Sequence, residues 1–172
     1  MDRGVLALVP VDRWREHVNG GGSSIAWLLF HVASHHDLAA ALVMGGAPLR
    51  EARRTTLGLD GLDPVVGVGE AEVADVADAL DPVALEAYVR DVHDRTATWL
   101  RDVDLDGFDV TPDSATFLAD VAGISAGDAP WLHSMWAGRP AGWFVQWETI
   151  GHGHTHVGEM VSVRNRMGLS PF

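Results

Sequence analysis

The sequence contains no cysteine and no lysine. Without cysteine the chain can form no disulfide and offers neither a thiol nucleophile nor a thiolate ligand, so any metal site has to use His, Asp or Glu. Scattered arginines carry all of the positive side-chain charge, and the formal net charge is -12. Proteins that bind nucleic acids neutralise the phosphate backbone with clustered Lys and Arg side chains. We therefore expect no nucleic-acid partner.

Long uninterrupted apolar runs are also absent. The longest, IAWLLFHVASHHDLAAALVM, is interrupted by His35, His36 and Asp37, and the apolar part of MDRGVLALVP is too short for a signal peptide. These features predict a cytoplasmic protein that does not enter a membrane.

Alternating strand patterns are rare, and Val65–Val68 is the only candidate strand. With 172 residues, 47% of them hydrophobic, the chain is long enough for one domain with a substantial core. Residues 1–172 are accordingly expected to form a single domain. The remaining patterns are helical, which predicts an all-α bundle.

The first half of the chain has one long apolar helical segment. It is expected from about Ser24 to Met44, with Ser23 or Ser24 as its N-cap and Gly45-Gly46 ending it. A short helix is expected over 11–18, an irregular connection over 45–69, and one further turn of helix around 70–80.

The second half has two clearer helices. Asp81 and Pro82 are typical of an N-cap and a first helical position, and the apolar spacing continues to Val103. Short helical pieces are expected over 116–124 and 129–138. A final helix should run from Ala141 to Met167 and end at a glycine.

The final helix contains the segment GHGHTHVGEM, residues 151–160. A helix turns about 100° per residue, so His152 and His156 share one face whereas His154 does not. Glu148 lies one turn before this pair and Glu159 about one turn after it. A polar stripe flanked by apolar residues suggests a buried site that requires a ligand or a partner.

Three glycines within the same segment support this interpretation. Gly151, Gly153 and Gly158 each cost a helix roughly 0.8–1 kcal/mol relative to alanine. Close helix packing or room for a ligand would compensate for this cost.

Two histidines do not make a specific metal site, because a catalytic zinc site takes about three protein ligands. The long apolar helix supplies a third candidate in His31, on the side expected to face the core, and His35 one turn later is a rival. The other histidines, His17, His36, His93 and His133, have no comparable context.

Three segments together resemble a known family. S-I-A-W-L-L-F-H (24–31), H-x-x-x-H-x-G-E (152–159) and R-N-R-M-G-L (164–169) are similar to motifs of the DinB-like superfamily of metal-dependent enzymes. The resemblance implies an up-down-down-up four-helix bundle with His31, His152 and His156 as metal ligands. The first family helix is long, whereas only about twenty residues precede Ser23 here, so this helix is expected to be short. A partner subunit in a homodimer could cover the gap.

The resemblance also implies a chemistry. Imidazole ligands suit Zn or Ni, and also Fe or Mn, and a dication polarises a bound water or thiol. Relatives include thiol-dependent S-transferases such as mycothiol-dependent maleylpyruvate isomerase, so a mycothiol- or bacillithiol-type cosubstrate and a small-molecule substrate are expected.

Two alternatives remain open. With water bound, the site would be hydrolytic, with Glu159 or Glu148 as the base. The second alternative is a stress-associated helical bundle that binds a metal and catalyses no reaction. Arg166, on the histidine stripe, either binds an anionic substrate or stabilises the end of the helix together with Arg164.

Overall fold

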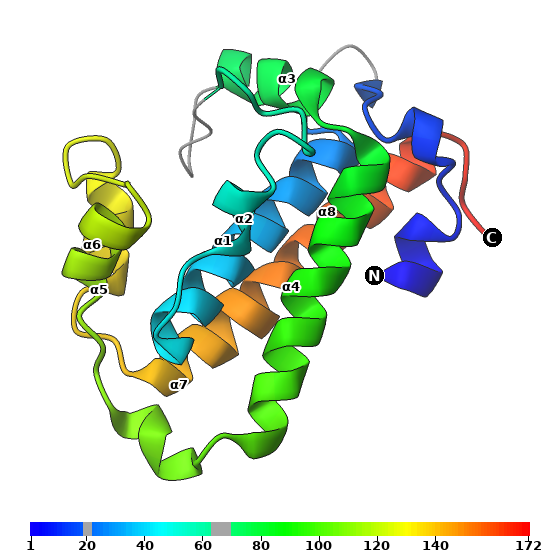
Figure 1. The fold of residues 1–172 in the computed structure, drawn as a ribbon. Helices are drawn as coiled ribbons and strands as arrows, with labels where there is room; N and C mark the ends of the chain where they lie inside the picture. The colour runs from blue at the N-terminus through cyan, green and yellow to red at the C-terminus, as the bar shows by residue number, and fades with distance from the viewer. Residues whose placement is uncertain (19–21, 63–69) are drawn as a thin grey trace.

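The computed structural model describes residues 1–18, 22–62 and 70–172, and every regular element within these ranges is helical (Figure 1). The all-α expectation is therefore confirmed, and the candidate strand Val65–Val68 lies outside the described residues. In chain order the elements are η1 (Asp2–Leu6), η2 (Val11–Arg13), α1 (Ile25–Met44), α2 (Leu49–Ala52), α3 (Glu70–Ala79), α4 (Pro82–Asp102), η4 (Leu105–Asp109), α5 (Ser114–Thr116), η5 (Phe117–Val121), α6 (Pro130–Trp136), α7 (Ala141–Phe144), η6 (Val145–Gly151) and α8 (His152–Arg166).

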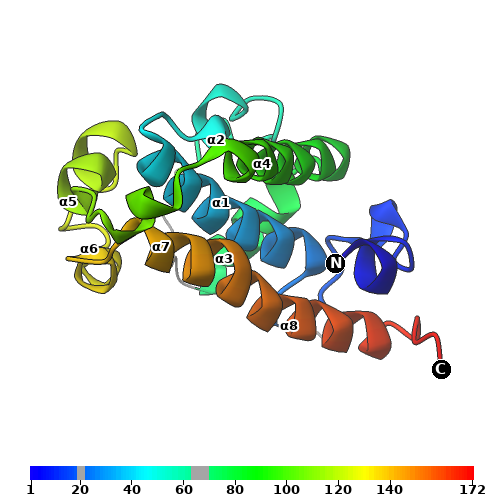
Figure 2. The same cartoon turned by 90° about the horizontal axis from the view of Figure 1, so that it is seen from below.

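Helix α1 is the centre of the molecule, lying between α4 on one side and the segment from α7 to α8 on the other (Figure 2). It begins and ends as expected. The Ser24 hydroxyl accepts a hydrogen bond from the Trp27 amide at 3.2 Å, and Gly45 ends the helix with a left-handed φ of 71°. Nearly all of its residues are buried, which explains why its apolar residues surround the helix instead of forming one stripe.

Helix α4 packs one apolar face on α1. Asp81 caps it through the amides of Val83 and Ala84, and Pro82 occupies the first turn, as expected. The buried Tyr88 hydroxyl donates to Asp37 of α1 at 3.0 Å. Apolar packing and a buried polar contact thus join α4 to α1.

Residues 45–69 were expected to be irregular, but they contain the short helix α2. The buried Asp37 carboxylate accepts hydrogen bonds from the amides of Leu49 and Arg50, the first two residues of α2. A side chain twelve residues earlier therefore caps this turn, so the local sequence could not reveal it. Helix α3 likewise spans ten residues instead of the single turn expected.

The final helical segment runs from Ala141 to Arg166, one residue short of the expected end at Met167, and it is not a uniform α-helix. Residues 145–151 form a π-helical stretch between α7 and α8. A Cβ at Gly151 would lie 3.0 Å from the Trp147 ring, and one at Gly153 would lie 3.6 Å from Val32 of α1. Close packing therefore accounts for Gly151 and contributes at Gly153, whereas a Cβ at Gly158 would meet nothing within 4 Å.

The N-terminal segment replaces a long first helix. The helix expected over 11–18 was wrong in extent, since only Val11–Arg13 is helical, while Asp2–Leu6 forms a second short piece. This segment is fixed to α8, because the Arg164 guanidinium donates to the carbonyl of Gly4. The first helix is thus short, and the up-down-down-up order of four long helices stays a prediction.

The pieces α5, η5 and α6 pack together beside one end of the long helices (Figure 1). They share a second apolar core with the C-terminal half of α1, centred on Leu38, Trp136 and Phe144. None of the described helices combines the length and the apolarity that a membrane span requires. This second core brings α6 up to His35 of α1 and Glu148 of η6.

Candidate metal centre

Three imidazoles from two helices meet in the interior of the bundle. His31 comes from α1, and His152 and His156 come from consecutive turns of α8. The Nε2 atom of His152 lies 3.1 Å from Nε2 of His31 and 3.0 Å from Nε2 of His156. The structure therefore brings together the three residues that the sequence indicated, and their ligand atoms could hold one metal ion.

Hydrogen bonds alone do not satisfy this arrangement. The His156 Nδ1–H donates to Glu159 at 2.8 Å, and in this tautomer, the form that binds a metal, Nε2 carries a lone pair. If His152 donates its Nε2–H to His156, this proton is no longer available for a hydrogen bond to His31, which faces the same nitrogen. A cation accepts all three lone pairs at once, which is the arrangement this donor set favours.

The spacing of the nitrogens also fits a shared ion. With metal–nitrogen bonds of about 2.0–2.1 Å, two ligands of one ion lie roughly 2.9 Å apart at a right angle and roughly 3.4 Å apart at the tetrahedral angle. The two observed Nε2 separations, 3.1 and 3.0 Å, fall within this range. Both pairs that involve His152 are therefore already spaced for binding to one ion.

Burial keeps His31 and His152 neutral. Burial, with a smaller contribution from the neighbouring imidazoles, lowers the pKa of His31 to about 2 and that of His152 to about 4. Neutral imidazole is the form that binds metals. At neutral pH the lone pairs of these two ligands are therefore available without the loss of a proton.

Glu148 lies beneath the three histidines and is itself buried. Its carboxylate accepts hydrogen bonds from the Trp136 indole N–H at 2.7 Å and from His35 Nδ1 at 3.2 Å. Its Oε2 lies 3.8 Å from Nδ1 of His152, a buried nitrogen that has no hydrogen-bond partner. Burial raises the pKa of Glu148, whereas the Trp136 bond and the His152 charge lower it. The carboxylate is positioned to orient His152.

His35 joins the cluster without replacing His31. Its ring centroid lies 4.7 Å from that of His31 and 4.6 Å from that of His152. With Glu148 and His152 it forms a second, overlapping group that could hold an ion. Burial lowers the pKa of His35 to about 3, and its Nε2 has no hydrogen-bond partner. The two groups share His152, so this residue is central to either arrangement.

The remaining candidates lie at the edge of the cluster. Glu159 is exposed and bonded to His156, whereas Arg166 contacts none of the three histidines and lines a separate small cavity next to Glu159. Both carboxylates proposed as bases are thus engaged with imidazoles.

The other histidines lie outside the centre, as expected. His17, His93 and His133 bond to the carbonyls of Gly22, Val89 and Ile124, respectively. His36 bonds to the hydroxyl of Thr96, and His154 is exposed.

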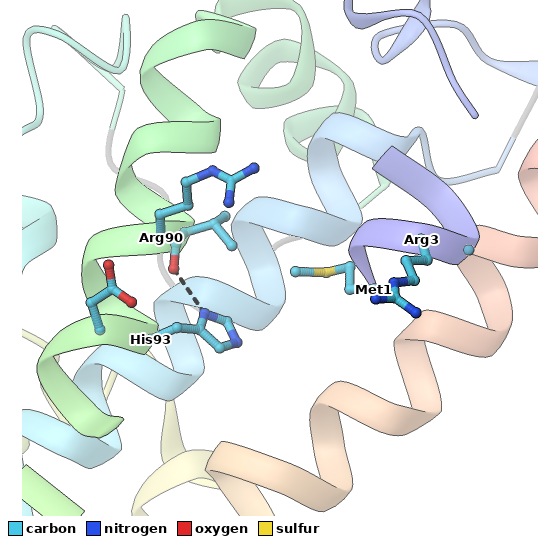
Figure 3. Close-up of a pocket in the computed structure, with 7 residues that line it drawn as sticks. Met1, Arg3, Arg90 and His93 are labelled. Atoms are coloured by element: carbon cyan, nitrogen blue, oxygen red, sulfur yellow. Dashed lines mark hydrogen bonds between the residues drawn. The ribbon is translucent and has the colours of Figure 1, made fainter. Parts of the chain in front are cut away.

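A cavity of about 560 Å³ lies between α4 and the N-terminal segment (Figure 3). Arg90 and His93 line it from α4, and Met1 and Arg3 line it from the N-terminal segment. None of the candidate ligands borders it, so it is separate from the metal centre.

Sequence reasoning did not identify the aromatic surroundings of the centre. The half-exposed Trp131 lies 6.1 Å from the His35 ring, and the half-exposed Trp147 lies 6.4 Å from the His152 ring. Trp136 supplies a hydrogen bond to Glu148. No local pattern distinguishes these tryptophans from core residues, because only the packing of α6 against α1 and η6 brings two of them to the site.

The comparison with known families agrees with these observations. The family model described as the DinB superfamily matches residues 3–160 of the chain. No curated protein matches the sequence.

Proposed function

Because the chain belongs to the DinB superfamily, we propose that its His31, His152 and His156 bind one divalent metal ion. One observation carries this proposal. The Nε2 atom of His152 lies 3.1 Å from that of His31 and 3.0 Å from that of His156, and the rings have too few N–H protons to make both contacts hydrogen bonds. Zn or Ni suits three imidazoles best, and Fe or Mn is compatible with them.

We further propose that the protein is a metal-dependent thiol S-transferase or isomerase that takes its thiol from a cosubstrate of the mycothiol or bacillithiol type. Neutral imidazoles leave the charge of a dication uncompensated, so the ion would lower the pKa of a thiol bound at an open position. Because the chain has no cysteine, the thiol has to come from outside. The half-exposed Trp131 and Trp147 offer apolar surface for a small-molecule substrate beside the centre.

The positions of the two carboxylates favour this function over hydrolysis. A hydrolytic site needs a base within reach of a metal-bound water. Glu148 is committed to Trp136 and His35, and Glu159 accepts a hydrogen bond from His156 on the side of the ring opposite Nε2. Both are placed to orient imidazoles, and we assign them positioning roles.

A homodimer is part of the same proposal. Trp147 and Ile150 lie one turn apart on the last helical segment, and both are at least 41% exposed. Exposed large apolar side chains that lie close together are typical of an interface. Light scattering on the purified protein tests this, and a monomer at micromolar concentration would refute it.

Elemental analysis of the untagged protein tests the metal site. Wild type should hold about one equivalent of metal, and His31→Ala and His152→Ala should hold almost none. His154→Ala is the matched control, because this exposed histidine lies on the same helix and faces away from the centre. Absence of metal from the wild type after reconstitution, or full retention in both variants, would refute the site.

Thiol chemistry is tested on the metal-loaded protein. Cobalt(II) in place of the native ion should give a thiolate-to-cobalt charge-transfer absorption when a thiol is added. Transfer of the thiol to an electrophile should be lost in His152→Ala. A cobalt-loaded protein that binds no thiol would favour the non-catalytic, metal-carrying alternative.

A further inference from the structure

A small polar cavity adjoins the metal centre. It has a volume of about 260 Å³ and lies on the seam between α1 and α8. Its lining comprises Ser23, Leu28, Glu159, Ser162, Val163 and Arg166. Leu28 lies one turn before His31 on α1, and Glu159 is hydrogen-bonded to His156 at 2.8 Å. The cavity therefore continues the histidine face of both helices by one to two turns.

Arg166 contributes the positive charge in this cavity. Its side chain is exposed and makes no ion pair or hydrogen bond with any residue that the structure describes. Arg164, in the same helical turn, is buried and bonds to Gly4 and Asn165. The fold thus uses Arg164 and leaves the guanidinium of Arg166 available to a ligand.

The other charged group in the cavity, Glu159, is bonded to one of the proposed metal ligands. The Glu159 carboxylate accepts the Nδ1–H of His156, whose Nε2 faces the proposed ion. The positive charge of a bound dication reaches Glu159 through this ring. With the ion in place, an incoming anion meets mainly the guanidinium of Arg166 and the hydroxyls of Ser23 and Ser162.

The distance from the centre to this guanidinium limits the size of the ligand. Ten residues separate Arg166 from His156, which corresponds to about 15 Å along the helix. Helical side chains lean toward the N-terminus, and an extended arginine covers roughly 6 Å of this distance. The imidazole of His156 leans in the same direction by a smaller amount, so a ligand held at both places spans roughly 10 Å.

We propose that this cavity binds a carboxylate of the thiol cosubstrate while its sulfur occupies the metal centre, which selects the bacillithiol type of cosubstrate because mycothiol has no carboxylate. This inference rests on the proposed function, since it concerns the second end of the same ligand. The carboxylate accepts the charge-assisted hydrogen bonds of the Arg166 guanidinium. The ligand class is an anionic thiol whose carboxylate lies several bonds from its sulfur.

Paired thiols of equal length test the proposal on the cobalt-loaded protein, with the thiolate-to-cobalt absorption as the readout. 6-Mercaptohexanoate should bind wild type about tenfold more tightly than 6-mercaptohexanol, which has no carboxylate. The Arg166→Ala variant should lose this preference while its affinity for 6-mercaptohexanol stays unchanged. Arg101→Ala is the control, because it removes an exposed arginine from α4 and should leave the preference intact.

Two results overturn the inference while leaving thiol binding established. One is equal binding of the two thiols by wild type, and the other is a preference that survives in Arg166→Ala. If neither thiol produces the charge-transfer absorption in wild type, the proposed function fails, and the inference fails with it.

Discussion

Acidification should destabilise the metal-free protein strongly, because the fold buries several neutral imidazoles. Burial lowers the pKa of His31 to about 2, those of His35 and His36 to about 3, and that of His152 to about 4. In the unfolded chain each titrates near about 6.5. Above that pH all four are neutral in both states and contribute no pH dependence.

At pH 5.5 the unfolded chain has protonated most of these side chains, whereas the folded protein has protonated almost none. The unfolded state then binds about four more protons, so the free energy of unfolding falls as the pH falls. Each histidine contributes about 1.4 kcal/mol to the difference between pH 7.5 and pH 5.5, and four contribute about 5 kcal/mol. Burial raises the pKa values of Asp37 and Glu148, which opposes this trend.

Urea unfolding with a chelator present, followed by tryptophan fluorescence at the two pH values, measures this difference. His36→Asn, whose ring contacts Thr96 and His93 and not the proposed ligands, should reduce the difference by about 1.4 kcal/mol. His31→Asn should reduce it by a similar amount. A wild-type difference below about 2 kcal/mol, or variants with the same pH dependence as wild type, would refute the reasoning.

Three further predictions follow from individual contacts. Zn²⁺ or Ni²⁺ at about a hundred times its Kd should stabilise wild type by about 2.7 kcal/mol, and calorimetry should show no such gain for His152→Ala. Trp136→Phe leaves the buried Glu148 carboxylate without its indole donor, and the free energy of unfolding measured by chemical denaturation should fall by about 1–3 kcal/mol. Metal binding should also weaken, and an unchanged metal affinity would contradict the positioning role of Glu148. Ser24→Ala removes the N-cap of α1 and should cost about 1 kcal/mol, whereas Ser24→Asp should restore most of the loss.

Local patterns were sufficient for the long helices. The cap at Ser24, the left-handed glycine at position 45 and the pair Asp81-Pro82 act within a few residues, and α1 and α4 begin and end where these signals lie. The pairing of His152 with His156 follows from four-residue spacing on one helix, and the structure retains it.

Contacts between distant segments decided the rest of the fold. Helix α2 depends on Asp37, and the N-terminal segment depends on Arg164 of the last helix. Neither contact leaves a signal in the residues around it. For this reason the expected irregular connection omitted α2, and the helix expected over 11–18 was too long.

The metal centre combines both kinds of information. By itself, the sequence determined an all-helical chain without thiols and two histidines on one helical face, because composition and helical periodicity are properties of the chain alone. Only the tertiary structure decided that His31 meets this pair and that Glu148 connects His35 with Trp136. His31 and His152 are 121 residues apart, and their meeting depends on how α1 packs against α8, a packing that no local pattern specifies.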